Sequence, residues 1–73
     1  MNAMKIFSGD GDTTVAEWDE TDVAQTEVAH GVFDAAKADG FAAVSPTPEG
    51  ARPLGEFDPS AKEIFLLKPI AGG

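Results

Sequence analysis

The last residues of the chain are the ones best suited to covalent chemistry. The sequence ends in Gly72-Gly73, after Pro69, Ile70 and Ala71. A carboxylate that must be activated inside another protein has to enter a narrow channel, and glycine lets the backbone approach closely because it has no side chain. Proline ends strand pairing, so these residues are expected to project as a mobile tail. The alternative is a frayed end without a function.

Other groups that could carry out catalysis are scarce. The chain has no cysteine and one histidine, His30, which leaves no thiolate nucleophile, cysteine zinc site or catalytic triad. We expect His30 to lie on a helix surface. A calcium loop is disfavoured because Thr13-Thr14-Val15 breaks the ligand register that would have to follow Asp10-Gly11-Asp12. We therefore predict a protein that is not an enzyme and binds no cofactor or metal of its own.

The charge balance is strongly acidic, with a formal net charge of −8. This charge repels nucleic-acid phosphates and anionic lipid and attracts partners with a basic surface. No apolar run is long enough to span a bilayer, and the lack of cysteine is typical of a reducing compartment. We expect a cytoplasmic protein that binds other proteins, and neither nucleic acid nor membrane. The alternative is that the excess acid only keeps a small domain soluble.

Two β-strands are predicted near the N-terminus. Residues 5–7 and 13–18 are rich in β-branched and aromatic side chains, and the glycines and aspartates between them favour a hairpin turn. Strict alternation in the second strand places Thr14, Ala16 and Trp18 on one face. Trp18 is the largest apolar side chain, so we expect it to anchor one edge of the core.

A helix is predicted between two terminal signals. Acidic and cap-forming side chains over residues 19–22 favour a helix start, and Gly40 suits a left-handed helix end. Gly31 costs about 1 kcal/mol relative to alanine inside a helix, and it indicates either a close approach to the sheet or a tolerated defect. Apolar residues with three- and four-residue spacing predict one buried face, which consists of Val28, Ala29, Val32, Phe33 and Ala36.

The second half of the chain alternates apolar segments with proline-containing ones. Residues 41–44 are predicted to form a third strand, and residues 45–50 a loop that two prolines keep out of regular pairing. Residues 52–54 are expected to return as a short edge strand. A tight turn over residues 57–62 then leads into an apolar final strand over residues 63–67.

This order of elements predicts one α+β domain over residues 1–73, with residues 69–73 as a flexible C-terminal tail. A hairpin, one crossing helix and a return hairpin can cover one face of a sheet and so close a small core. The predicted architecture is β-grasp-like, a ββαββ(β) mixed sheet with one crossing helix.

The end of the chain resembles two families with a C-terminal diglycine. Residues 62–73 are similar to the ends of molybdopterin-synthase small subunits and archaeal ubiquitin-like modifiers, with an apolar strand, a proline, a small aliphatic residue, alanine and diglycine. Met4-Lys5-Ile6-Phe7 also looks like the first strand of ubiquitin, and Phe57-Asp58-Pro59 falls where ubiquitin has an aromatic turn. The resemblance implies a ubiquitin-like protein modifier or sulfur carrier. Its terminal carboxylate would be activated by an E1-like adenylating enzyme that uses ATP and Mg²⁺.

Two features differ from the sulfur-carrier pattern. Pro59-Ser60-Ala61-Lys62 stands where that family has a polar turn with a Gly-Asp step, and Lys68 replaces the first of two common prolines. These differences leave a more general β-grasp modifier, or an unrelated domain with a similar tail, as alternatives to a molybdopterin role.

The final strand is apolar on both of its faces. By resemblance to ubiquitin, Ile64 and Leu66 face the core, while Phe65 and Leu67 lie on the outer sheet face and form a partner-binding patch. The alternatives are that Phe65 and Leu67 pack under a loop or that the two faces are reversed.

A second function fits the same residues. The protein could be a non-enzymatic acidic binding or structural module, for example a small virion component of a phage or mobile element, that docks through Phe65 and Leu67. Deletion of Gly73 would abolish the function of a modifier and leave that of a docking module intact.

Overall fold

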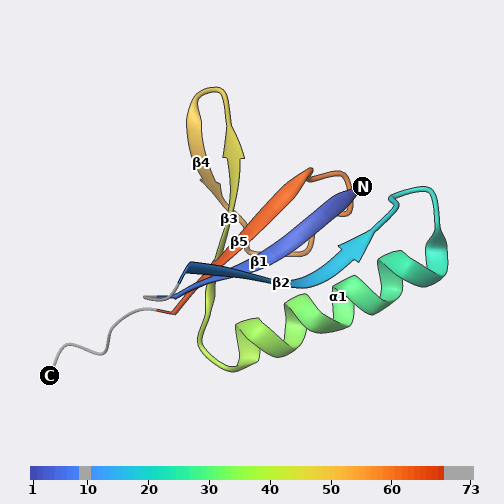
Figure 1. Cartoon of the computed structure of the whole chain (residues 1–73), viewed down its shortest axis with the longest axis horizontal. Coiled ribbons are helices and arrows are strands. Elements are labelled where there is room, and N and C mark those ends of the chain that lie inside the picture. The colour runs from blue at the N-terminus through green and yellow to red at the C-terminus, as the bar shows by residue number, and fades with distance from the viewer. Residues whose placement is uncertain (9–10, 69–73) are drawn as a thin grey trace, which may run out of the picture.

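The computed structural model describes residues 1–8 and 11–68, and the expected tail, residues 69–73, lies outside them. In this part of the chain one helix and five strands follow the predicted order (Figure 1). The protein is therefore a small α+β structure, as predicted. The elements are β1 (Asn2–Ser8), β2 (Gly11–Trp18), α1 (Val23–Ala38), β3 (Ala42–Thr47), β4 (Gly50–Pro53) and β5 (Glu63–Leu67).

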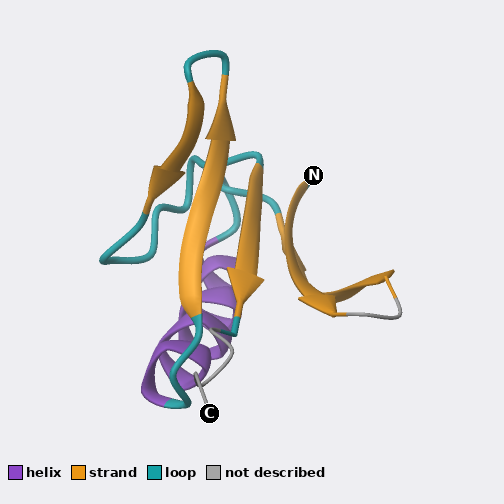
Figure 2. Ribbon diagram, turned by 90° about the vertical axis from the view of Figure 1, so that its left-hand side faces the viewer, coloured by secondary structure: helices purple, strands orange, loops and turns teal. Residues whose placement is uncertain are grey.

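The strands form one mixed sheet in the order β2-β1-β5-β3-β4. The central strand β5 runs parallel to β1 and antiparallel to β3, and the outer pairs β1·β2 and β3·β4 are antiparallel. Parallel neighbours cannot be joined by a tight turn, so the chain passes through α1 and the β3–β4 hairpin before β5 returns beside β1. The helix covers one face of the sheet and leaves the other face open (Figure 2).

A β-bulge in the first hairpin changes the predicted facing of β2. Met4 pairs with Ala16 and Lys5 pairs with Thr14, so Val15 is an extra residue without a partner in β1. Because directly opposed residues share a face, Thr14 and Ala16 lie on opposite faces, and the strict alternation predicted for β2 is wrong. The bulge brings both Val15 and Ala16 against the core.

The helix ends are formed by the residues predicted for them. Asp22 is the N-cap, and its carboxylate accepts a hydrogen bond from the backbone N–H of Gln25 at 3.1 Å. Gly40 follows the last turn with a φ of 97°, a left-handed conformation that costs glycine nothing. No helix among residues 1–8 and 11–68 has both the length and the apolar character that crossing a membrane requires.

The buried face of α1 is narrower than predicted. Ala29 and Phe33 are buried, and Val32 and Ala36 are partly buried against the core. Val28 is 69% exposed, so its prediction as a core residue is wrong. At 3.6 residues per turn, a residue five positions before Phe33 lies roughly 140° around the helix and points away from the sheet.

Gly31 also lies away from the sheet. No atom lies within 4 Å of the position where a Cβ would be at Gly31. A close approach between helix and sheet therefore does not explain this glycine, which leaves a tolerated defect.

Pro46 does not prevent strand pairing, contrary to the prediction, whereas Pro48 lies in the turn. β3 continues through Pro46, which pairs with Ala51 of β4, and the turn falls later, before Gly50 with its φ of 118°. Only residues 42–44 of β3 pair with β5. Pro46 lies beyond that stretch, so its missing N–H removes no bond to the sheet interior.

The core lies between the sheet and α1. Its largest fully buried side chains are Trp18, Phe33, Met4, Ile64 and Leu66. Trp18 is thus confirmed as a core anchor.

Polar groups tie the segment between β4 and β5 to the edge of the core. The indole N–H of Trp18 donates to the carbonyl of Pro59 at 2.9 Å. The side-chain amide of Asn2, which is only 3% exposed, donates to the carbonyls of Pro59 and Ala61, both at 2.9 Å. Buried polar atoms are tolerated when they are paired in this way.

Candidate functional site

The residues singled out from the sequence fall into two groups. Pro69, Ile70, Ala71, Gly72 and Gly73 lie outside the described residues. Phe65 and Leu67 belong to β5, and their surroundings can be described. The candidate site therefore lies on the outer face of the sheet.

The two faces of β5 are arranged as the resemblance to ubiquitin implied. Ile64 and Leu66 are fully buried under α1. Phe65 and Leu67 point to the opposite face, because side chains alternate along a strand. Phe65 is half-buried and Leu67 is 37% exposed. These two side chains thus remain accessible to a partner.

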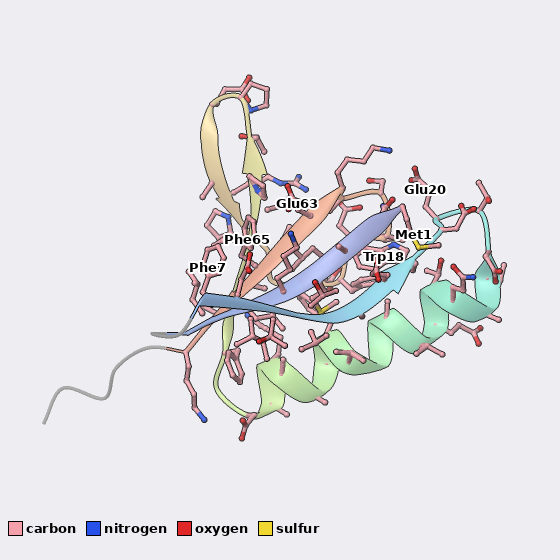
Figure 3. All side chains as sticks on the ribbon, in the orientation of Figure 1. Met1, Phe7, Trp18, Glu20, Glu63 and Phe65 are labelled. Atoms are coloured by element: carbon pink, nitrogen blue, oxygen red, sulfur yellow. The ribbon has the colours of Figure 1, made fainter. Side chains whose placement is uncertain are left out.

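Phe7 is a member of this face that the sequence analysis missed. Its ring stacks on that of Phe65 with the centroids 4.5 Å apart and the planes at 23° (Figure 3). Phe7 is 44% exposed. Met4 of the same strand is buried, so alternation along β1 places Phe7 on the outer face. Its position beside Phe65 could be predicted only once the parallel pairing of β1 with β5 was known.

Neighbouring strands extend the apolar surface sideways. Val44 pairs with Phe65 across β3·β5 and with Pro53 across β3·β4, while Ala42 pairs with Leu67. Opposed residues share a face, so these side chains form one surface. We call this surface the apolar outer face and define it as Phe7, Ala42, Val44, Pro53, Phe65 and Leu67.

Charged groups flank the apolar outer face without covering it. Lys5 and Glu63, which precede Phe7 and Phe65 by two residues on their strands, form an ion pair at 3.4 Å. Both side chains are partly exposed, and such pairs contribute little to stability. The two charges cancel each other, so this pair adds no net charge beside the aromatic rings. The chain as a whole carries −8.

Among residues 1–8 and 11–68, two carboxyl groups have shifted pKa values, and both shifts arise from turns. The Ser60 hydroxyl, 2.7 Å from Asp58, lowers the pKa of that carboxyl, with further help from the Ser60 backbone N–H and the Arg52 guanidinium. The Thr21 backbone N–H and hydroxyl lower the pKa of Asp19 in the same way. Hydrogen bonds to the ionised form have this effect, and here they stabilise the loops that enter β5 and α1.

Metal ligands do not gather in the described part of the chain. No three histidine, aspartate or glutamate side chains among residues 1–8 and 11–68 come together as a set that could hold a metal ion. The same residues leave no buried side-chain nitrogen or oxygen without a hydrogen-bond partner.

In comparisons with known proteins, no family model, curated protein or solved structure matches this chain.

Proposed function

We propose that this protein is a ubiquitin-like β-grasp protein that acts through other proteins, as a protein modifier or a sulfur carrier. In this role the apolar outer face docks on a partner, and an E1-like adenylating enzyme activates the carboxylate of Gly73. The observation that carries the proposal is the open apolar outer face on β5, the strand that is followed in the sequence by Lys68 and then by residues 69–73.

The sheet supports the β-grasp part of the proposal. In the sequence, the crossing helix α1 lies between the β1–β2 hairpin and the β3–β4 hairpin. Both hairpins belong to one sheet, in which the last strand, β5, lies parallel to the first, β1. One face of that sheet is covered by α1, so a partner can reach the other face of β5 without unfolding anything. The last described residue, Lys68, follows β5 directly.

The proposed chemistry takes place on the activating partner. The carboxylate of Gly73 attacks the α-phosphate of ATP, which forms an acyl adenylate and releases pyrophosphate, with Mg²⁺ held by the partner and its nucleotide. A sulfur or amine nucleophile then displaces AMP and leaves a thiocarboxylate, thioester or amide. This chain supplies the docking surface and the carboxylate, and the partner supplies the catalytic groups.

One observation favours a second function, that of a non-enzymatic binding or structural module such as a small virion component. The apolar outer face is complete within residues 7 to 67 and does not need the diglycine. A docking module would use this face with a partner whose surface is apolar at the centre and basic around it, as the charge of −8 favours.

The intact mass of the protein isolated from its native host tests the diglycine function. That mass shows whether Gly73 is the last residue of the mature protein and whether it carries a thiocarboxylate or a covalent adduct. A modified Gly73 supports the modifier or carrier. A free carboxylate in all material, with full function after deletion of Gly73, would exclude that function and favour the docking module.

Substitutions on the outer face test the docking step. Phe65→Ala and Leu67→Ala are expected to weaken the binding of the native partner by tenfold or more, on the order of a hot-spot loss. Val28→Ala is the matched control, because it removes an exposed apolar side chain from α1 instead of the sheet. Equal weakening by all three variants would contradict docking through this face.

A further inference from the structure

A hollow on the covered side of the molecule has features of a binding site that the outer face does not use. It has a volume of about 420 Å³ and lies between α1 and the segment after β4. Its lining consists of His30, Asp34, Gly55, Glu56 and Phe57. The volume is at the lower end of the range of about 300–1,000 Å³ that small-ligand sites occupy.

Aromatic rings form one wall of this hollow. The His30 and Phe57 rings stack with their centroids 5.2 Å apart and their planes at 19°. Phe57 also contacts the rings of Trp18 and Phe33, at 5.2 and 5.7 Å, so the wall is anchored in the core. His30 itself is exposed on the helix surface, as the sequence predicted. A rigid aromatic wall that reaches solvent is a suitable platform for a planar or cationic group.

Carboxylates lie beside the aromatic wall, and the nearby cations are engaged elsewhere. The Asp34 carboxylate lies 3.4 Å from Nε2 of His30. Glu56 forms no ion pair with any residue in the described part of the chain. Arg52 pairs with Asp58 and Lys37 contacts the carbonyl of Leu54. The hollow thus combines an aromatic wall with two carboxylates, and neither Arg52 nor Lys37 forms an ion pair with either carboxylate.

We infer that this hollow binds the guanidinium group of an arginine side chain presented by a protein partner. A guanidinium is planar, stacks on aromatic rings and donates hydrogen bonds to carboxylates in a fork that a lysine ammonium cannot match. The overall charge of −8 also attracts basic partners to the molecule as a whole. The inference does not depend on the diglycine function, because it uses neither the outer face nor residues 69–73.

The test is a titration of the full chain with N-acetyl-arginine amide, in which binding is monitored through the backbone amide chemical shifts in NMR spectra. Saturable shifts are expected at residues 30, 34 and 55–57. Glu56→Gln and Asp34→Asn should each weaken binding roughly two- to fivefold, the effect of one partly exposed charge. Glu49→Gln, which removes the same charge from the exposed turn of the β3–β4 hairpin, should leave the affinity unchanged.

Two further probes complete the test, one neutral and one cationic. The citrulline amide has the shape of arginine without its charge and should give no saturable shifts, and the lysine amide should bind more weakly than arginine. Equal binding of citrulline or lysine would overturn the recognition of a guanidinium. Equal weakening by Glu49→Gln and Glu56→Gln would show attraction by net charge only and would overturn the site.

Discussion

Ile64 and Leu66 on one face of β5 are fully buried beneath α1, whereas Phe65 and Leu67 on the other face remain partly open to water. The four side chains are of the same apolar kind and alternate along one strand. Burial of apolar surface is worth about 25 cal/mol per Å², so folding draws its stability from the covered face. The open face has the same chemistry and retains surface that only a partner can bury.

The sharpest test of this contrast uses the adjacent residues Leu66 and Leu67. Leu66→Ala is expected to lower the free energy of unfolding by about 2–5 kcal/mol, because it leaves a cavity in the core. Leu67→Ala should cost about 1 kcal/mol or less, as for a surface position. Urea unfolding monitored by Trp18 fluorescence measures both values. Similar losses for the two variants would mean that the outer face is covered within the monomer.

The side-chain amide of Asn2 is a polar group at the edge of the covered face, and its hydrogen bonds should contribute to stability. In Asn2→Leu the carbonyl of Ala61 loses its side-chain donor, while the carbonyl of Pro59 keeps the indole N–H of Trp18. An unpaired buried carbonyl costs about 1–3 kcal/mol, and this is the loss expected in urea unfolding. Gln25→Leu, which replaces an exposed amide, is the control and should cost less. A fully stable Asn2→Leu variant would show that water replaces the amide.

The stacking of Phe7 on Phe65 should contribute to the stability of the monomer, although it lies on the open face. A double-mutant cycle with Phe7→Ala and Phe65→Ala should give a coupling of about 0.5–1.5 kcal/mol, typical of stacked rings. Phe65→Ala combined with Val28→Ala should give additive losses, because Val28 lies on the far side of α1. A coupling near zero for the aromatic pair would indicate rings that are free to move apart.

The smallest expected effect on stability concerns Asp58, which lies in the loop between β4 and β5. The hydrogen bond from the Ser60 hydroxyl lowers the pKa of Asp58 below 3.8. The stability it contributes is therefore complete above pH 3.8 and disappears as the pH falls through the lower folded value. Because the carboxylate is partly exposed, Asp58→Asn should cost less than about 1 kcal/mol at pH 7.

Urea unfolding between pH 7 and pH 2 measures this difference. The curves of the wild type and Asp58→Asn should converge at the acid end. Asp12→Asn, at the exposed start of β2, should not be destabilising at pH 7, because it reduces the excess negative charge. A constant difference between wild type and Asp58→Asn at every pH would assign the effect to packing instead of ionisation.

Local elements of this protein could be predicted from the residues alone. The Asp22 cap, the left-handed Gly40 and the apolar final strand depend on interactions between residues that are close in sequence. The placement of Phe65 and Leu67 on the outer face came from the resemblance to ubiquitin, and it agrees with the structure.

Contacts between distant segments decided the rest. The bulge at Val15, the pairing of Pro46, the exposure of Val28 and the stacking of Phe7 on Phe65 each depend on which strand or helix lies alongside. Apolar side chains on β5 look alike in the sequence, and only the packing of α1 against one face distinguishes core from surface. The physical reason is that local propensity acts over a few residues, whereas burial depends on partners brought together by the whole chain.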